Sequence, residues 1–140
     1  MSITIKDSKS PDVPDVPAVS GPFDKIKATD CTADSKDIKV EDGKVTLNST
    51  SSYIAVDLDF GNETARRITA YVAEPNSGGQ LYVRSGNLSA TVGTVYNLGS
   101  NGSLKEAGNT LYPTVTGKAK IYIQASKPGV QIEWIQFGNK

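Results

Sequence analysis

Hydrophobic and polar residues alternate along most of the chain after Gly21. The clearest example is the segment from Tyr53 to Phe60, in which Ile54, Leu58 and Phe60 fall on one face and Asp57 on the other. Every second side chain of a β-strand points to the same side, so this pattern predicts a strand with one buried face. No run of ten or more residues has the 3.6-residue period of an amphipathic helix. The chain is therefore predicted to be all-β.

Other segments with the same alternation predict further strands, about ten in all, separated by turn residues. They cover residues 23–28, 38–40, 45–47, 66–73, 81–84, 92–98, 111–115, 119–125 and 130–137. The turn Pro75–Gly79 is expected to join strands 66–73 and 81–84 into a hairpin. Short strands at this spacing are typical of two antiparallel sheets packed face to face. The predicted fold is thus a two-sheet antiparallel β-sandwich of the jelly-roll type.

The first 22 residues differ from the rest of the chain. Residues 11–17 read PDVPDVP, and a proline at every third position is typical of a polyproline II segment without packing partners. We interpret residues 1–22 as a linker or tail and residues 23–138 as the folded module. If the segment is a linker, it joins the module covalently to another domain.

Charge narrows the possible partners. The chain has 15 Lys and Arg and 15 Asp and Glu, and its basic residues form no cluster. Such a chain offers little attraction to a nucleic acid backbone or an anionic membrane, and no stretch approaches the ~20 apolar residues of a spanning helix. We expect a monomer that binds neither nucleic acid nor membrane and acts outside the cell.

The residue types present also disfavour catalysis. Histidine, the commonest general base, is absent from the chain. Cys31 is the single cysteine and lies among Thr29, Asp30, Thr32 and Asp34, where acidic neighbours disfavour a thiolate. Cys31 is therefore expected to be a small, buried or half-buried residue, and the module is predicted not to be an enzyme.

The tyrosines are the most informative candidates for a binding site. Alternation along three predicted strands places Tyr71, Tyr82 and Tyr122 on the outward side. If these strands share a sheet, the three rings form a flat platform suited to sugar rings. Its polar edge would consist of Arg84, Lys120 and Gln124. The alternative is that the tyrosines only cover the sheet, since tyrosine favours strands.

The loop edge offers a second set of candidate contacts for sugar hydroxyls. Its residues include Tyr53, Tyr96, Asn97 and Gln131.

The closing strand supplies a further aromatic residue and an acid. Trp134 alternates with Val130 and Ile132, so it is expected in the core. Glu133 and Asp30 carry the hard oxygen ligands that calcium prefers, so they are candidate ligands of a structural calcium ion.

Several blocks of the chain resemble a known family. They are FDKIKATD at residues 23–30, YIAVDLDFG at 53–61, ITAYVAEPNSGGQLYVRSG at 68–86, VGTVYNL at 92–98, and IYIQ followed by VQIEWIQFG near the end. In content and spacing they resemble the family 6 carbohydrate-binding modules, β-sandwiches attached to glycan-degrading enzymes. The resemblance implies two ligand sites, one in a cleft among the loops and one on a concave sheet face.

The chain departs from that family at the loop cleft and at the calcium site. Lys27 and Thr29 stand where family members usually carry two glutamates, and Ser103 and Leu104 occupy the stretch that usually supplies a stacking tryptophan. Gln131 replaces an asparagine that bonds the ligand. The outward tyrosines are therefore the preferred site.

Taken together, the residues and the resemblance predict noncatalytic binding of a polysaccharide that targets an attached enzyme to its substrate. Xylan, β-glucan and an acidic glycan such as pectin are the candidate ligands. The alternative function is a spacer or protein-contact domain that has lost sugar binding.

Overall fold

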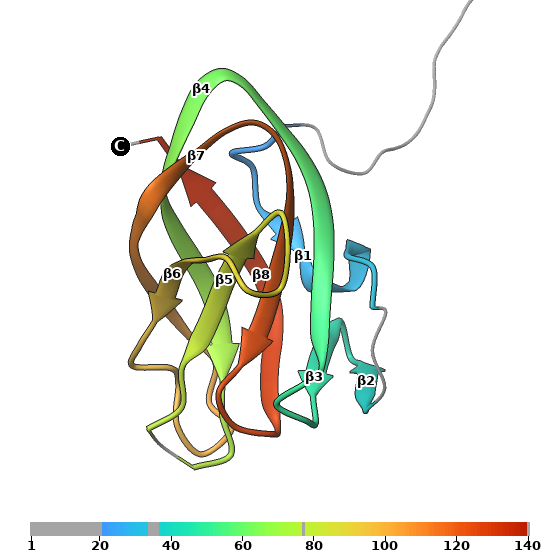
Figure 1. Ribbon diagram of the computed structural model, residues 1–140. Helices are drawn as coiled ribbons and strands as arrows, with labels where there is room; N and C mark the ends of the chain where they lie inside the picture. Colours follow the sequence, from blue (N-terminus) through green and yellow to red (C-terminus); the bar gives the residue numbers. More distant parts are fainter. Residues whose placement is uncertain (1–20, 34–36, 77, 140) are drawn as a thin grey trace, which may run out of the picture.

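Two long strands, β4 (Tyr53–Ala73) and β7 (Lys105–Ala125), pair with each other in antiparallel register and run through the whole structure. In the computed structural model, which describes residues 21–33, 37–76 and 78–139, both strands arch over one end of the molecule (Figure 1). The bends contain Gly61 and Gly117, whose φ angles of 60° and 63° are readily adopted only by glycine. Each long strand thus contributes one half to each of two layers.

The shorter strands extend these two layers. Layer A contains the first half of β4, the second half of β7, β5 (Leu81–Ser85) and β6 (Thr91–Val95). Layer B contains the second half of β4, the first half of β7, β8 (Val130–Gly138), β3 (Lys44–Leu47), β2 (Ile38–Glu41) and β1 (Ile26–Lys27). One 3₁₀ turn, Ala28–Asp30, follows β1. The prediction of an all-β antiparallel sandwich is confirmed.

The core fills the space between the two layers. Each strand buries its alternate hydrophobic side chains there, as predicted for the inward residues of segments 66–73, 81–84 and 119–125. Ile68, Leu81 and Ile121 are among the side chains without measurable exposure. Near one end, the Phe60 ring packs against the rings of Phe23 and Phe137 at centroid distances of 5.4 and 5.5 Å. Burying such side chains stabilises the fold by about 1.5–3 kcal/mol each.

Two details of the predicted strand arrangement were wrong. Segments 53–60 and 66–73 are one bent strand, and so are 111–115 and 119–125, so the described residues form eight strands. The hairpin predicted between 66–73 and 81–84 does not form, because β4 pairs with β7 and β8 whereas β5 pairs with β6 and β7. The intervening residues carry the chain from layer B to layer A. A turn-rich segment has the same composition whether it reverses a strand or changes layers.

The connections 74–80 and 96–104 both cross between the layers at the end opposite the bends. Backbone hydrogen bonds join them: the Glu74 N–H donates to the Gly99 carbonyl over 2.7 Å, and the Gly102 N–H donates to the Glu74 carbonyl over 2.8 Å. Gly99 also donates to the carbonyl of Val72 over 3.2 Å. These bonds fix the shape of this end of the molecule, which we call the loop end and which consists of connections 74–80 and 96–104.

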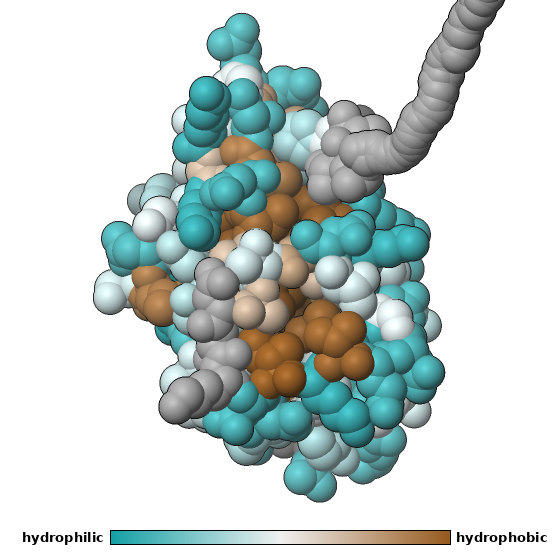
Figure 2. All heavy atoms as spheres, turned by 90° about the vertical axis from the view of Figure 1, so that its right-hand side faces the viewer, coloured by the Kyte–Doolittle hydropathy of each residue, from teal (hydrophilic) through white to brown (hydrophobic). Residues whose placement is uncertain are grey.

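The side of the molecule that carries β1, β2, β3 and the first half of β4 exposes hydrophobic side chains at its centre (Figure 2). Hydrophilic side chains surround them (Figure 2). The partly buried Phe23, Ile38 and Val56 pack against the core, and Val40 on β2 is 61% exposed. The core therefore approaches the surface on this side.

Gly99→Ala should lower the free energy of unfolding by about 1–3 kcal/mol, the usual cost of overpacking. A Cβ atom at residue 99 would overlap the Ser103 carbonyl oxygen and lie 3.0 Å from the Val72 carbonyl oxygen. Urea unfolding measures the loss. The matched control is Gly138→Ala, whose nearest neighbour would be the Arg67 Cβ at 3.9 Å; equal stability of the two variants would contradict this account of the loop end.

Candidate functional site

Three strands of layer A bring tyrosines together on the outer face of the sandwich. Gln124 of β7 lies in register between Tyr53 of β4 and Tyr82 of β5, and Tyr122 lies between Ala55 and Arg84. The rings of Tyr53 and Tyr122 meet edge to face with centroids 5.5 Å apart. We call this set the tyrosine face, and it consists of Tyr53, Tyr82, Arg84, Tyr122 and Gln124.

Cationic groups hold two of these rings in place. The guanidinium carbon of Arg84 lies 5.1 Å from the Tyr82 ring centroid, and the Arg84 Nε donates to the Thr91 hydroxyl over 2.9 Å. The Lys120 ammonium lies 5.8 Å from the Tyr122 ring centroid. Such cation–π contacts contribute about 0.5–1 kcal/mol at exposed sites. The tyrosine face is thus partly ordered before any ligand arrives.

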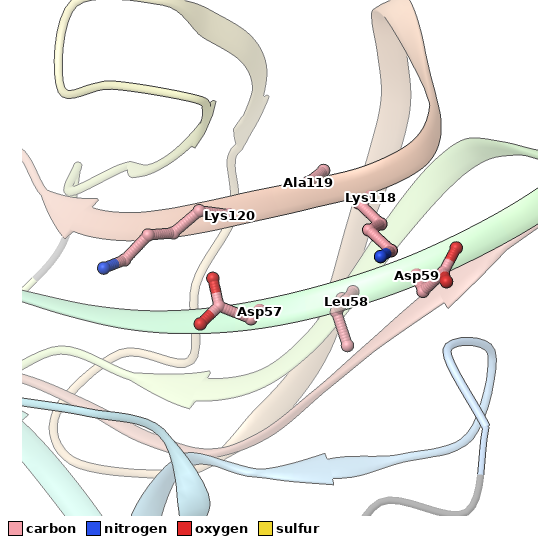
Figure 3. A pocket seen from close by; sticks show the side chains of 6 residues that line it. All are labelled: Asp57, Leu58, Asp59, Lys118, Ala119 and Lys120. Atoms are coloured by element: carbon pink, nitrogen blue, oxygen red, sulfur yellow. The ribbon is translucent and has the colours of Figure 1, made fainter.

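Charged residues continue the same outer face toward the bends. Asp57 and Asp59 of β4 lie in register with Lys120 and Lys118 of β7, and they line a hollow of about 370 Å³. Figure 3 shows the two aspartates of β4 beside the two lysines of β7, with Leu58 pointing away from them. Opposite charges across neighbouring strands stabilise each other by about 0.2–1 kcal/mol. The hollow offers hydrogen-bond donors and acceptors of both charges.

Tyr71 does not belong to the tyrosine face, so the platform predicted from Tyr71, Tyr82 and Tyr122 is divided. The bend of β4 moves Tyr71 into layer B, where it lies opposite Trp134. The two rings stack with centroids 5.7 Å apart and an interplanar angle of 19°. Alternation along each strand was correctly interpreted, but it carried no information on which layer a residue joins.

The prediction that Trp134 lies in the core was wrong. Tyr71 pairs with Trp134 and Val72 pairs with Ile132, which leaves Glu133 as an extra residue in a β-bulge. Because of the bulge, Ile132 and Ile135 are both buried whereas Trp134 is only partly buried. The indole therefore lies on the outer face of layer B.

Glu133 and Trp134 line a hollow of about 430 Å³ on layer B together with Lys25, Lys27 and Asp42. The Lys25 ammonium lies 4.4 Å from the Trp134 ring centroid. Two lysines repel a divalent cation, and no group of three or more Asp, Glu, Cys or His suited to a metal occurs within the described residues. The donor set does not fit calcium, and the expectation of a calcium ion at Glu133 and Asp30 has no support in this part of the chain.

The loop-edge candidates divide between two pockets. Tyr96 and Asn97 line a pocket of about 390 Å³, and Gln131 lines a separate pocket of about 290 Å³. Tyr53, expected at the loop edge, belongs to the tyrosine face. Glu74 lines both pockets and is 3% exposed, and sequence reasoning missed it. The one sequence feature that could have identified Glu74 is the position of an acidic residue directly between the end of a buried strand and the turn Pro75–Gly79.

Cys31 is half-buried, and its thiol donates to the Lys27 carbonyl over 3.7 Å. Burial, together with the nearby Asp30 carboxylate, raises the pKa of the Cys31 thiol to about 12. A thiol with this pKa is almost wholly protonated at neutral pH, so Cys31 is a poor nucleophile.

The sequence profile of the family described as carbohydrate binding module (family 6) matches residues 23–139. The chain belongs to this family. It is a noncatalytic module of a carbohydrate-binding family, with a β-sandwich fold. A search of curated protein sequences found no match. No helix among the described residues is long and apolar enough to cross a membrane.

Solved structures of the same fold carry sugars. The module is similar to CsCBM6-3 from Clostridium stercorarium in complex with cellobiose, with 26% identity, a TM-score of 0.74, and coverage of 87% of this chain and 100% of that one. A family 6 module from Clostridium cellulolyticum in complex with xylose is 20% identical, with a TM-score of 0.71 and coverage of 85% and 99%.

A longer enzyme also contains this fold. The module is 25% identical to a family 43 arabinoxylan arabinofuranohydrolase from Bacillus subtilis, solved in complex with cellotetraose. The TM-score is 0.66, and the match covers 87% of this chain but 28% of the enzyme. In that protein the fold is one part of a glycoside hydrolase.

Calcium should leave the stability of the module unchanged. An ion that bound the native state would raise the melting temperature, so we expect equal melting temperatures in millimolar calcium chloride and in excess EDTA. Differential scanning calorimetry checks this. The comparison variant is Lys27→Glu, which adds a carboxylate beside Glu133. A calcium-dependent rise in the melting temperature of the wild type would contradict the interpretation that the lysines exclude the ion.

The Cys31 thiol should react with iodoacetamide far more slowly in the folded protein than in urea at pH 8. Unfolding returns the thiol pKa to about 8.5 and so restores the thiolate. Because the folded state keeps the proton, the fold should lose stability as the pH rises above that value. Mass spectrometry of the alkylated protein measures the rates; equal rates in both states would contradict the burial of this thiol.

Proposed function

We propose that this module binds a polysaccharide chain along the tyrosine face and thereby holds an attached enzyme on its substrate. The carrying observation is the convergence of Tyr53, Tyr82 and Tyr122 from three strands around the amide of Gln124. Sugar binding needs flat apolar faces beside fixed hydrogen-bonding groups. The tyrosine face combines both.

The length of the face suits a chain rather than a single sugar. From Tyr53 to Asp59 the strand rises about 20 Å at ~3.4 Å per residue. Along this distance the tyrosines are followed by the hollow between Asp57, Asp59, Lys118 and Lys120. Both parts lie open on the outer surface of one layer, which favours contact with several consecutive sugars of one chain.

The charges of the face favour a neutral glycan such as xylan or β-glucan over pectin. Asp57 and Asp59 offset Lys118 and Lys120, which leaves Arg84 as the one unbalanced charge of this described surface. For a polyuronate, the two aspartates cancel the attraction of the two lysines, so only Arg84 would draw in its carboxylates. Neutral hydroxyl groups, in contrast, can donate to the aspartates and accept from the lysines.

Attachment to an enzyme is supported by two observations. The proline-rich residues 11–17, which lie outside the described residues, have the composition of a semi-rigid linker. The similar fold in the Bacillus subtilis enzyme occupies 28% of a longer glycoside hydrolase. We propose that this module has the same arrangement and works outside the cell, where polysaccharides are found.

Tyr82→Ala should weaken binding to xylan or β-glucan about thirtyfold, because a central tyrosine of an interface contributes about 2 kcal/mol. Affinity electrophoresis with each polysaccharide, followed by calorimetry, measures the loss. Tyr71→Ala is the matched control, since Tyr71 lies on layer B and should leave affinity unchanged. If the wild type binds neither glycan, the module acts as a spacer or protein-contact domain instead.

Salt distinguishes the candidate glycans. Binding of a neutral chain should change little between low and high sodium chloride, because salt screens only interactions between charges. Calorimetry at several salt concentrations measures this. A steep loss of affinity with salt, together with binding to pectin, would identify an acidic glycan and contradict the charge argument above.

A further inference from the structure

Glu74 places a nearly unpartnered carboxylate inside the loop end. Its side chain is 3% exposed, and both carboxylate oxygens accept from one donor, the Gly79 N–H, at 2.9 and 3.0 Å. A carboxylate offers about four acceptor positions, and no other hydrogen bond or ion pair reaches this one from the described residues. A buried charge with so few partners is costly unless another donor satisfies it.

The local sequence is arranged to keep this carboxylate in place. A Cβ atom at residue 79 would lie 2.6 Å from the Glu74 Oε1, so any larger residue there would displace the carboxylate from this position. The Glu74 backbone is held on both sides by its bonds to Gly99 and Gly102. Both the side chain and the backbone of Glu74 are therefore positioned before any ligand binds.

The pocket beside Glu74 has the chemistry of a sugar site. Its volume of about 390 Å³ lies at the small end of the ~300–1,000 Å³ typical of small-molecule pockets. Besides Glu74, the side chains that line it include Gln80, Tyr96, Asn97, Ser100 and Lys105. They offer an aromatic ring, which is 48% exposed on Tyr96, and both donors and acceptors. Asn97 has a φ angle of 58°, which fixes the turn next to that ring.

This pocket continues the tyrosine face at the end away from Asp59 and Lys118. Gln80 precedes Tyr82 by two residues, and Tyr96 follows Thr94, the register partner of Tyr82, by two residues. Gln80 directly precedes β5 and Tyr96 directly follows β6, so both stand where the face of Tyr82 and Thr94 meets the loops. A chain that leaves Tyr82 in this direction meets the crossing loops 74–80 and 96–104. The face is thus open at its charged end and closed at Glu74.

We propose that the Glu74 pocket receives the terminal residue of the glycan chain, with the Glu74 carboxylate accepting hydrogen bonds from its hydroxyl groups. The proposal rests on the binding proposed above for the tyrosine face and adds a direction to it. The terminal residue must be neutral, because a terminal uronate would place a second carboxylate beside the buried Glu74. The module therefore binds chain ends, with the following residues of the chain on the tyrosine face.

Stoichiometry tests the proposal directly. Isothermal titration calorimetry is done with xylan fractions of increasing mean length, and in parallel with β-glucan fractions. End binding gives one module per chain at every length. Binding along the chain instead gives a number of modules that rises with length, and that result would overturn the proposal while leaving the tyrosine face intact as a site.

Glu74→Gln tests the role of the carboxylate. The amide oxygen can still accept from Gly79, so the melting temperature should stay close to the wild type. Affinity should fall about ten- to a hundredfold, the range for losing hydrogen bonds to a charged acceptor. Glu41→Gln is the matched control, because Glu41 is 59% exposed on β2 and pairs with Lys39 in layer B.

The remaining outcomes separate the two proposals. Unchanged affinity of Glu74→Gln in a folded protein would overturn the assignment of the carboxylate. Loss of binding in Tyr82→Ala with unchanged affinity in Glu74→Gln would retain the tyrosine face and reject the pocket. Absence of binding to both glycans by the wild type would reject both. One module per chain and a weakened Glu74→Gln would support both.

Discussion

The pairing of β4 with β7 is the constraint on which the other features depend. The two strands stay hydrogen-bonded on both sides of their bends, so each carries its alternating pattern into both layers. The loop end forms because the layers must be joined again by crossing segments once the long strands end. The tyrosine face forms because the second half of β7 has β4 on one side and β5 on the other.

Much of the fold could be predicted from the sequence, since alternation is a local property of the chain. It correctly separated inward Ile68 and Ile121 from outward Tyr71 and Tyr122. It could not show that Tyr71 and Tyr122 lie on opposite faces of the sandwich. That depends on the bends at Gly61 and Gly117, where both glycines have positive φ angles. The sequence alone does not distinguish a glycine within a bent strand from a glycine in a turn.

The candidate site was predicted in part for the same reason. Tyr82, Arg84, Tyr122, Lys120 and Gln124 were placed on a common surface by alternation and do lie together. Trp134 was misplaced because a bulge adds one residue to the strand, and a single extra residue reverses the inward and outward positions that follow it. Glu74 gave no periodic signal, because its burial depends on two loops that meet only in the folded protein.

Trp134 has a practical consequence for studies of the module. It is the single tryptophan of the chain, and it lies on layer B, stacked on Tyr71 under the ammonium of Lys25. A ligand on the tyrosine face, on the other side of the sandwich, would leave the surroundings of the indole unchanged. Tryptophan fluorescence should therefore not change when a glycan binds to the tyrosine face, although it should change when layer B unfolds.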